Sequence, residues 1–216
     1  MNKNIKKHIK NDVLFQDLNR VSIDDDVKIG KGTVIGCGVV LLGQTEIGEN
    51  CEILGECNLK NTKIGDNVKI KSSYIIDSEV GNKTTVGPYA HIRQNSKIGE
   101  GCRIGNFVEI KNSILGNNTK SAHLTYIGDA EIGNNVNLGC GVVFANYDGK
   151  KKYHTIVGNN VFIGCNCNLV APLIVNDNCY IACGTTVTKN LDKDSFCIGR
   201  VRQEEKEISD CAFLKF

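Results

Sequence analysis

The sequence predicts an all-β protein, a parallel β-helix built from hexapeptide repeats, and three observations lead to this fold class. An aliphatic residue recurs every six residues along most of the chain. Glycine accounts for 23 of 216 residues while proline accounts for only 2, so many tight corners are needed. A helix with 3.6 residues per turn cannot keep one apolar face at this spacing, whereas short β segments separated by turns can.

The repeats are expected to form one domain over residues 23–188. Each six-residue unit, here called a hexad, begins with a head residue that is buried only by stacking on heads in neighbouring coils. With three hexads per turn, as in the left-handed β-helix proteins that this pattern resembles, the chain forms roughly nine coils with a rise of about 4.8 Å each. The predicted heads are Ile23, Ile29, Ile35, Leu41, Ile47, Ile53, Leu59, Ile64, Ile70, Ile76, Val80, Val86, Ile92, Ile98, Ile104, Ile110, Leu115, Ser121, Ile127, Ile132, Leu138, Phe144, Val157, Ile163, Leu169, Val175, Ile181 and Val187.

The 11 cysteines fit the same repeat and do not indicate a disulfide framework. Their number is odd and the N-terminus lacks a secretory signal, so we expect reduced thiols. The small, inward fifth place of a hexad is occupied by Cys51, Cys57, Cys102, Cys167 and Cys179. The third place, near a corner, is occupied by Cys37, Cys140, Cys165 and Cys183, and Cys197 and Cys211 follow in the tail. None of these spacings is typical of a zinc site.

Three segments depart from the repeat and are expected to lie outside the regular coils. Residues 1–22 form an N-terminal arm, with a short helix expected around residues 13–18. Residues 145–156 form an insertion loop, because the heads Phe144 and Val157 stand 13 residues apart instead of six. Residues 189–216 form a polar C-terminal tail. Function is expected at such departures, since the coils themselves are scaffold.

Composition excludes several functional classes. The net charge of +2 gives no electrostatic footprint for nucleic acid, and no run of 18 apolar residues predicts a membrane span. The lack of a signal peptide favours a cytoplasmic protein. No Gly-rich phosphate loop follows a strand, so Rossmann-type nucleotide binding is not indicated. No two of the four histidines are close enough in sequence for a zinc-dependent hydratase.

Residues one 18-residue coil apart should stack in columns, and two columns contain reactive side chains. Arg93 and Lys111 are 18 residues apart, so two cations should lie about 5 Å apart. They are either solvated surface charges or an anion site. Neighbouring columns hold His91, Glu109 and Tyr126, and then Asn106, His123 and Cys140. The polar Ser121 replaces an aliphatic head just before His123, which fits a functional site better than a core.

Five motifs within residues 80–202 resemble one family closely, and the earlier coils match it loosely. The motifs are GPYAHIR (87–93), GNFVEIK (105–111), AHLTYIGDAEIG (122–133), NYDG (146–149) and LVAP (169–172). They resemble the C-terminal acetyltransferase domain of the bacterial bifunctional N-acetylglucosamine-1-phosphate uridyltransferase and glucosamine-1-phosphate acetyltransferase. The resemblance implies a left-handed β-helix that transfers acetyl from acetyl-CoA to glucosamine 1-phosphate without a metal, in a homotrimer with sites between subunits.

The resemblance also implies a role for each matching residue. His123 would be the general base, and Glu109 would orient or polarise it. The substrate-binding positions would be Arg93, Lys111, Tyr126, Asn137 and Lys152. Asn146 and Tyr147 would border the acetyl group, where donors could stabilise an oxyanion. The remaining coenzyme-binding positions would be Cys140, Cys165, Cys183 and Arg200.

Two departures from the family and two competing functions remain open. The coenzyme-lining positions are usually Ala, Ser and Ala, but here they are cysteines, which could be acylated or form mixed disulfides. The uridyltransferase domain is not expected, because the hexads begin at residue 23. One alternative is an acyltransferase for another amino sugar. The other is a non-catalytic trimer that binds a sugar nucleotide or serves a separate pyrophosphorylase; acetyl-CoA turnover would distinguish an enzyme from this binding protein.

Overall fold

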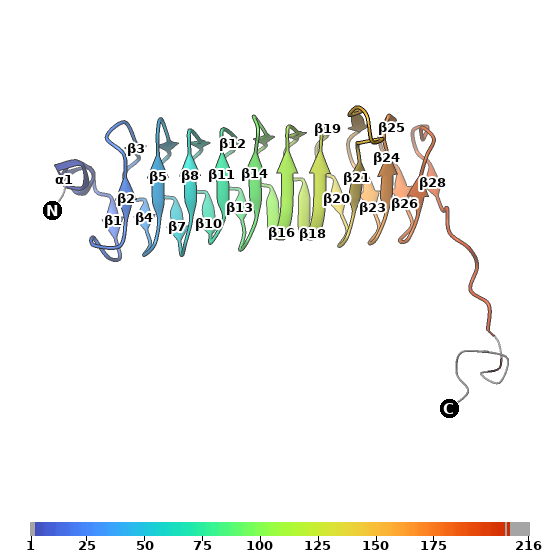
Figure 1. The fold of residues 1–216 in the computed structure, drawn as a ribbon, viewed down its shortest axis with the longest axis horizontal. Helices are drawn as coiled ribbons and strands as arrows, with labels where there is room; N and C mark the ends of the chain where they lie inside the picture. The colour runs from blue at the N-terminus through green and yellow to red at the C-terminus, as the bar shows by residue number, and fades with distance from the viewer. Residues whose placement is uncertain (1–2, 206, 208–216) are drawn as a thin grey trace.

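The computed structural model describes residues 3–205 and residue 207, and these residues form an elongated parallel β-helix with one helix at its N-terminal end (Figure 1). The described chain makes about 10 turns. Each turn contributes short strands to three faces, and strands on the same face pair in parallel with the turns before and after. This arrangement confirms the prediction of stacked hexads.

Faces 1, 2 and 3 are defined by their strands. Face 1 contains β1 (Leu14–Phe15), β4 (Val34–Ile35), β7 (Glu52–Leu54), β10 (Lys69–Lys71), β13 (Thr85–Val86), β20 (Asn137–Leu138), β23 (Phe162–Ile163), β26 (Tyr180–Ile181) and β28 (Phe196–Cys197). Face 2 contains β2 (Ser22–Ile23), β5 (Val40–Leu42), β8 (Asn58–Lys60), β11 (Tyr74–Ile76), β14 (His91–Arg93), β21 (Val143–Ala145), β24 (Asn168–Val170) and β27 (Thr186–Val187). Face 3 contains β3 (Lys28–Ile29), β6 (Glu46–Ile47), β9 (Lys63–Ile64), β12 (Glu79–Val80), β15 (Lys97–Ile98), β17 (Ile114–Leu115), β19 (Ala130–Ile132), β22 (Thr155–Val157) and β25 (Leu173–Val175).

Two nine-residue strands cross the corner between faces 1 and 2, here called the 1–2 corner. They are β16 (Arg103–Lys111) and β18 (Lys120–Gly128), which pair along nearly their whole length. Phe107 and Leu124 turn this corner with φ of 57° and 45°, and both side chains are exposed. Bulky residues rarely adopt the left-handed region, so this corner is conformationally unusual.

The core is a stack of hexad heads and small fifth-place side chains. Almost all predicted heads are buried, and so are all five fifth-place cysteines. One head was predicted wrongly. Ile75 is fully buried and pairs with Leu59 and Ile92, whereas Ile76 is only half-buried. The reason is a shorter coil at this point, which places the inward side chain one residue earlier.

The regular coils extend further than residues 23–188 at both ends. The helix expected around residues 13–18 is absent there; α1 spans Lys3–Lys10 instead, and Leu14–Phe15 form β1, which pairs with β4. Val13 is buried in the first coil, so the apolar residues near position 13 belong to a coil of the β-helix and not to a helix. In the predicted tail, β28 pairs with β26. Cys211 lies outside the described residues.

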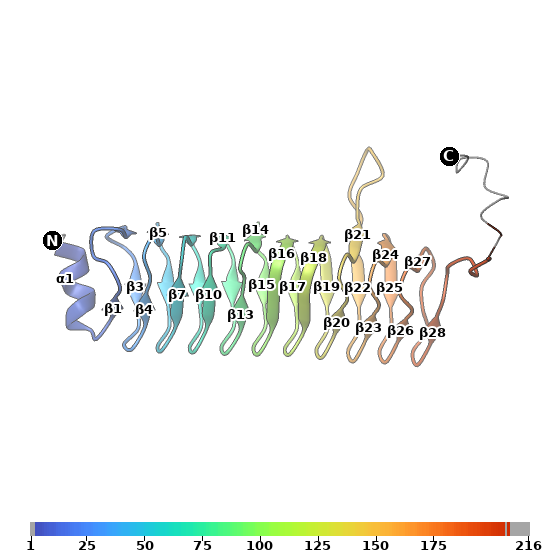
Figure 2. The same cartoon turned by 90° about the horizontal axis from the view of Figure 1, so that it is seen from below.

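The insertion forms a hairpin that projects from the corner between faces 2 and 3, here called the 2–3 corner (Figure 2). It connects β21 to β22, and Tyr147 and Lys152 form an isolated antiparallel bridge across it. Asp148 Oδ1 accepts hydrogen bonds from the amides of Lys150 and Lys151, both at 2.8 Å. These bonds give the hairpin a defined turn, which places Lys152 back against the coils.

Candidate active site

Arg93 and Lys111 lie side by side at the end of face 2, as the 18-residue column predicts. Arg93 ends strand β14, Lys111 ends strand β16, and the two are direct partners in the parallel register. Lys111 is 7% exposed and Arg93 is half-buried. The burial of Lys111 excludes a pair of solvated surface charges, because a buried ammonium needs a compensating charge.

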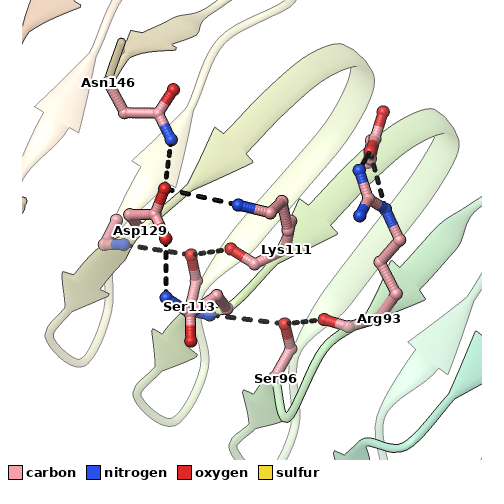
Figure 3. A network of polar contacts seen from close by, with 9 residues as sticks. Arg93, Ser96, Lys111, Ser113, Asp129 and Asn146 are labelled. Atoms are coloured by element: carbon pink, nitrogen blue, oxygen red, sulfur yellow. Dashed lines mark hydrogen bonds and ion pairs between the residues drawn. The ribbon is translucent and has the colours of Figure 1, made fainter. Parts of the chain in front are cut away.

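The protein supplies one carboxylate to each cation. Glu109 Oε1 accepts hydrogen bonds from Arg93 Nε at 3.0 Å and Arg93 Nη2 at 2.6 Å. Lys111 Nζ lies 3.4 Å from Asp129 Oδ2 (Figure 3). The repulsion expected between the two cations is therefore already reduced without a bound anion.

Asp129 is the centre of the polar network at the 2–3 corner (Figure 3). Its Oδ1 accepts a hydrogen bond from Asn112 Nδ2 at 2.6 Å, and its Oδ2 accepts one from Asn146 Nδ2 at 2.5 Å. Burial by itself would raise the pKa of Asp129, but the Asn112 hydrogen bond and the Lys111 charge outweigh it. The pKa of Asp129 is therefore lowered, and the carboxylate stays ionised beside Lys111.

Two buried serines fix the backbone that carries the cations. Ser96 Oγ donates to the Arg93 carbonyl at 2.7 Å, and Ser113 Oγ donates to the Lys111 carbonyl at 2.8 Å. The Ser113 amide in turn donates to Ser96 Oγ at 3.3 Å (Figure 3). Successive coils are therefore joined beneath the charged side chains, which limits the freedom of both cations.

The hairpin brings a third cation to this site. Interaction with Lys111 lowers the pKa of Lys152, and interaction with Lys152, followed by the charge of Asp129, raises the pKa of Lys111. Arg93 also contributes to the lowered pKa of Lys152. Three cations thus meet two carboxylates, and an anion bound here would relieve the contact between like charges.

Tyr126 and Asn146 approach the same network closely over Gly128. A Cβ on residue 128 would lie 2.6 Å from the Tyr126 ring carbon that carries the hydroxyl and 2.7 Å from Asn146 Nδ2. Only glycine leaves room for this approach. Asn146 is 6% exposed and its amide donates to Asp129. Its observed role is therefore to support the Asp129 carboxylate.

His123 lies on the 1–2 corner, and its partner differs from the predicted one. Its Nδ1 lies 2.7 Å from Asn106 Oδ1, and the two residues are direct partners of β18 and β16. Glu109, which was predicted to orient His123, bonds to Arg93 instead. The reason is their positions: Glu109 pairs with Tyr126 in the column of face 2, whereas His123 precedes the corner.

A column of cysteines continues from His123 along the 1–2 corner. The backbone register places Cys140, Cys165 and Cys183 in successive coils above it. Three backbone hydrogen bonds set this register: Gly141 N donates to the His123 carbonyl at 3.3 Å, Asn166 N donates to the Cys140 carbonyl at 2.8 Å, and Gly184 N donates to the Cys165 carbonyl at 2.8 Å. Arg200 closes the column, because its Nη1 donates to the Cys183 carbonyl. Four of the predicted coenzyme positions therefore form one line, whereas Asn146 and Tyr147 lie at the 2–3 corner.

Several predicted site residues lie apart from the cations in one chain, because His123, Cys140, Cys165 and Cys183 lie on the 1–2 corner at the other edge of face 2. Asn137 begins β20 on face 1, beyond the 1–2 corner, whereas Arg93 and Lys111 end strands on face 2. Tyr147 pairs with Lys152 in the hairpin, but its side chain is exposed and its hydroxyl donates to the Gly149 carbonyl at 2.8 Å. A single chain therefore does not assemble the complete set.

Sequence reasoning missed three residues that the structure places in the network. Asn106 was noted only as a column neighbour of His123, and Asp129 and Asn112 were not singled out. Counting does not place Asp129 opposite Lys111, because the register pairs Lys111 with Gly128 and Asp129 is the next residue, at the corner. Asn112 gave no signal either, since its contact depends on the conformation of the corner.

The family model for the bacterial transferase hexapeptide (six repeats) matches residues 26–61, 77–112 and 154–189, which together make up half of the chain. The chain belongs to this hexapeptide transferase family. Among curated proteins, it is 52% identical over 201 residues to the bifunctional protein GlmU of Clostridium botulinum and 50% identical over 202 residues to that of Clostridioides difficile. These matches cover 93% and 94% of this chain but only 44% of each relative, in its C-terminal region.

One solved structure confirms the fold of this hexapeptide transferase. LpxA, a UDP-N-acetylglucosamine acyltransferase from Bacteroides fragilis, matches with a TM-score of 0.63 and 21% identity, covering 84% of this chain and 70% of that chain. The predicted left-handed β-helix is therefore confirmed.

Two features are absent from the described part of the chain. Within residues 3–205 and 207, no three His, Cys, Asp or Glu side chains are grouped so that they could hold a metal ion. In the same part of the chain, no helix is both long and apolar enough to cross a bilayer.

Proposed function

We propose that this protein transfers an acetyl group from acetyl-CoA to the amine of glucosamine 1-phosphate, giving N-acetylglucosamine 1-phosphate for UDP-N-acetylglucosamine synthesis. The observation that carries the proposal is the cationic cluster of Arg93, Lys111 and Lys152 beside Tyr126, on the fold of an acyltransferase family. The relatives named GlmU support the choice of acceptor, since they are about half identical over nearly the whole of this chain.

His123 acts in this proposal as the general base. When Nδ1 donates its hydrogen to Asn106 Oδ1, Nε2 is left with the lone pair that accepts a proton. The sugar amine loses a proton to Nε2 as its nitrogen attacks the thioester carbonyl, and the C–S bond then breaks to release CoA thiolate. An imidazole is suited to this transfer near neutral pH.

The phosphate is bound by Arg93, Lys111 and Lys152. Guanidinium and ammonium groups form strong, charge-assisted hydrogen bonds to phosphate oxygens. A phosphate dianion adds two negative charges where three cations meet two carboxylates, and it removes the repulsion that lowers the pKa of Lys152. Tyr126 and Asn137 bind the sugar hydroxyls.

The coenzyme lies along the 1–2 corner over Cys140, Cys165 and Cys183. Arg200 meets its phosphates at the far end of the column, and Asn146 and Tyr147, which lie at the 2–3 corner, border the acetyl group from a neighbouring copy of the chain. This path begins at His123, where the thioester is needed, and follows the backbone register of the corner. No metal takes part in this reaction.

The active unit is a homotrimer with each site between subunits. Asn137 and the cationic cluster lie on different faces of one chain, so a second copy supplies the missing side. The exposed apolar side chains of Tyr89, Phe107 and Leu124 on the 1–2 corner favour burial against such a copy. Action in the cytoplasm, with a separate pyrophosphorylase completing the UDP-sugar, belongs to the same proposal.

The test measures release of free CoA thiol from acetyl-CoA with four acceptor conditions: glucosamine 1-phosphate, glucosamine, glucosamine 6-phosphate and no acceptor. We expect release only with the 1-phosphate. The His123→Ala variant should lose about 10²-fold or more in kcat, whereas a variant of the exposed histidine of the hairpin, His154→Ala, should retain it. Silence with every acceptor, or full activity of His123→Ala, would refute the proposal.

A further inference from the structure

Cys165 and Cys183 differ from the other described cysteines in their exposure. Both are exposed at the 1–2 corner, whereas Cys37, Cys140 and Cys197 are half-buried. The five fifth-place cysteines are buried, and burial raises the pKa of the thiols of Cys51, Cys57, Cys102 and Cys167. Since the thiolate is the nucleophile in disulfide exchange, the core thiols are poorly reactive and the corner thiols are accessible.

The two exposed thiols occupy equivalent positions in adjacent coils. Gly184 N donates to the Cys165 carbonyl at 2.8 Å, which sets residues 183 and 165 opposite each other in the parallel register. Gly164 packs directly against the backbone of Cys183, so no side chain separates the two coils at this corner. Neighbouring strands lie about 4.8 Å apart, inside the Cα separation of about 4.4–6.8 Å that a disulfide requires.

A positively charged hollow lies beside Cys183. It is lined by Cys183, Ile198, Arg200, Val201, Arg202 and Gln203. Arg200 Nη1 lies 3.1 Å from Cys183 Sγ. The Arg200 guanidinium next to the exposed thiol, with Arg202 lining the same hollow, favours the approach of an anionic reagent.

We propose that Cys165 and Cys183 form a reversible disulfide by exchange with an anionic, low-molecular-weight disulfide. The Cys183 thiolate attacks one sulfur of the reagent, whose S–S bond breaks to release one thiolate and leave a mixed disulfide. The Cys165 thiolate then attacks Cys183 Sγ and releases the second thiolate. Two cysteines are oxidised, the reagent is reduced to two thiols, and the two cysteine protons are taken up by those products.

The disulfide also has a consequence that rests on the proposed function. The coenzyme is proposed to lie over this column, so a bond between Cys165 and Cys183 moves both sulfurs from the positions that border it. We expect the oxidised protein to bind CoA about tenfold or more weakly than the reduced protein, and reduction with dithiothreitol to restore the affinity.

The first experiment maps the disulfide by mass spectrometry. The protein is incubated with oxidised glutathione, free thiols are alkylated under denaturing conditions, and chymotrypsin then cleaves between Cys167 and Cys179. We expect the Cys165 fragment to be joined to the Cys183 fragment, with both cysteines unalkylated and no glutathione retained. The Cys165→Ser variant should instead keep one glutathione on Cys183, and the matched control Cys37→Ser should behave as the unchanged protein.

The second experiment tests the charged hollow. Oxidised glutathione is anionic and cystamine is a cationic disulfide, so glutathione should react about tenfold faster or more. Arg200→Gln should reduce this preference. Complete alkylation of both cysteines after oxidation, or a bridge between other cysteines, would overturn the proposal.

Binding of CoA, measured by calorimetry on reduced and oxidised protein, separates the two proposals. Equal affinity of both forms, with the disulfide present by mass, would refute the effect on the coenzyme. No binding by the reduced protein would count against the proposed function and would leave the disulfide to be judged on the mass data.

Discussion

Lys111 is a buried ammonium whose charge is compensated mainly by Asp129, and this pair controls the local stability of the site. At 3.4 Å and an effective dielectric constant of about 20, the attraction is about 5 kcal/mol. Desolvation offsets much of this attraction, so the pair gives little net stability. Removing one partner is different, because it leaves the other charge buried without compensation.

Asp129→Asn should therefore destabilise the protein by about 3 kcal/mol at pH 7, because Lys111 stays charged and buried. Urea denaturation followed by circular dichroism measures the change. Glu131→Gln is the matched control, since Glu131 is exposed and its partner His154 lies 3.6 Å away. We expect the control to change stability by less than about 0.5 kcal/mol. Equal stability of Asp129→Asn and the unchanged protein would contradict the assignment.

The lowered pKa of Asp129 also predicts how the stability lost in Asp129→Asn depends on pH. The pKa of Asp129 is lowered in the folded state, so its charge stabilises the fold fully above the unfolded value of about 3.9. This stabilisation is lost as the pH falls below that value toward the folded pKa. The difference between the unchanged protein and Asp129→Asn should therefore shrink below about pH 4. A difference that grows under acid would contradict this sign.

Asn106 is a positioning residue for His123, because its amide oxygen determines which imidazole nitrogen carries the hydrogen. Asn106→Leu should lower kcat by about 10-fold to 100-fold while the KM values for acetyl-CoA and the sugar phosphate change little. Steady-state kinetics with both substrates varied measures this separation. Asn106→Asp keeps an acceptor and should move the acidic limb of the pH–rate profile to higher pH, because a carboxylate stabilises protonated imidazole. An unchanged kcat in Asn106→Leu would show that Asn106 does not position His123 for catalysis.

The fifth places of successive hexads form ladders in which a hydroxyl joins two coils. Thr119 shows the regular pattern: its Oγ1 donates to the Gly133 carbonyl at 2.9 Å and accepts from the Val136 amide at 3.2 Å. Thr155 Oγ1 is equally buried but has no hydrogen-bond partner. In the column of Thr155, Ser113 Oγ donates to the Lys111 carbonyl two residues before it, whereas the residues before Thr155 belong to the hairpin and its hydroxyl makes no such bond.

Thr155→Val should raise the stability by about 1 kcal/mol, because it replaces an unsatisfied buried hydroxyl with a methyl group of similar volume. Thr119→Val is the matched control and should lower it by about 1 kcal/mol, since it breaks two hydrogen bonds. Thermal denaturation of both variants compares the two effects. A loss of stability in Thr155→Val as large as in Thr119→Val would mean that Thr155 is hydrogen-bonded in solution.

At the scale of the whole molecule, the proposed site needs residues from two faces that no single chain joins. Asn137 lies on face 1 and Lys111 at the end of face 2, with the 1–2 corner between them. A closed trimer of parallel prisms can place face 1 of one copy next to face 2 of another. The two residues then serve the same site from different subunits.

Coexpression of two defective variants tests this arrangement. Lys111→Ala and Asn137→Ala should each be weakly active alone. Mixed trimers should contain one site with both residues intact, so activity should recover to about one third of the unchanged value per trimer. Analytical ultracentrifugation confirms the trimer, and coexpression of Lys111→Ala with Lys152→Ala tests whether the hairpin serves its own subunit. If coexpression of Lys111→Ala with Asn137→Ala restored no activity, Lys111 and Asn137 would have to serve the same site from one subunit.

The sequence by itself determined the period, the buried face and the columns of this protein. A six-residue repeat fixes where each head points, so the pairing of Arg93 with Lys111 and of Asn106 with His123 follows from counting. The misplaced head at Ile76 shows the limit of counting, because one shorter coil shifts the inward residue.

Only the tertiary structure decided which polar groups meet. Asp129 reaches Lys111 through a corner conformation, and Lys152 reaches it through the fold of the hairpin. The hexad period sets neither of these two contacts, because both depend on backbone dihedrals and on side-chain directions outside the strands. The helix at Lys3–Lys10 is a similar case, since the pairing of β1 with β4 drew residues 14–15 into the first coil. Local sequence thus determined the scaffold, and contacts between distant segments determined the chemistry at its corners.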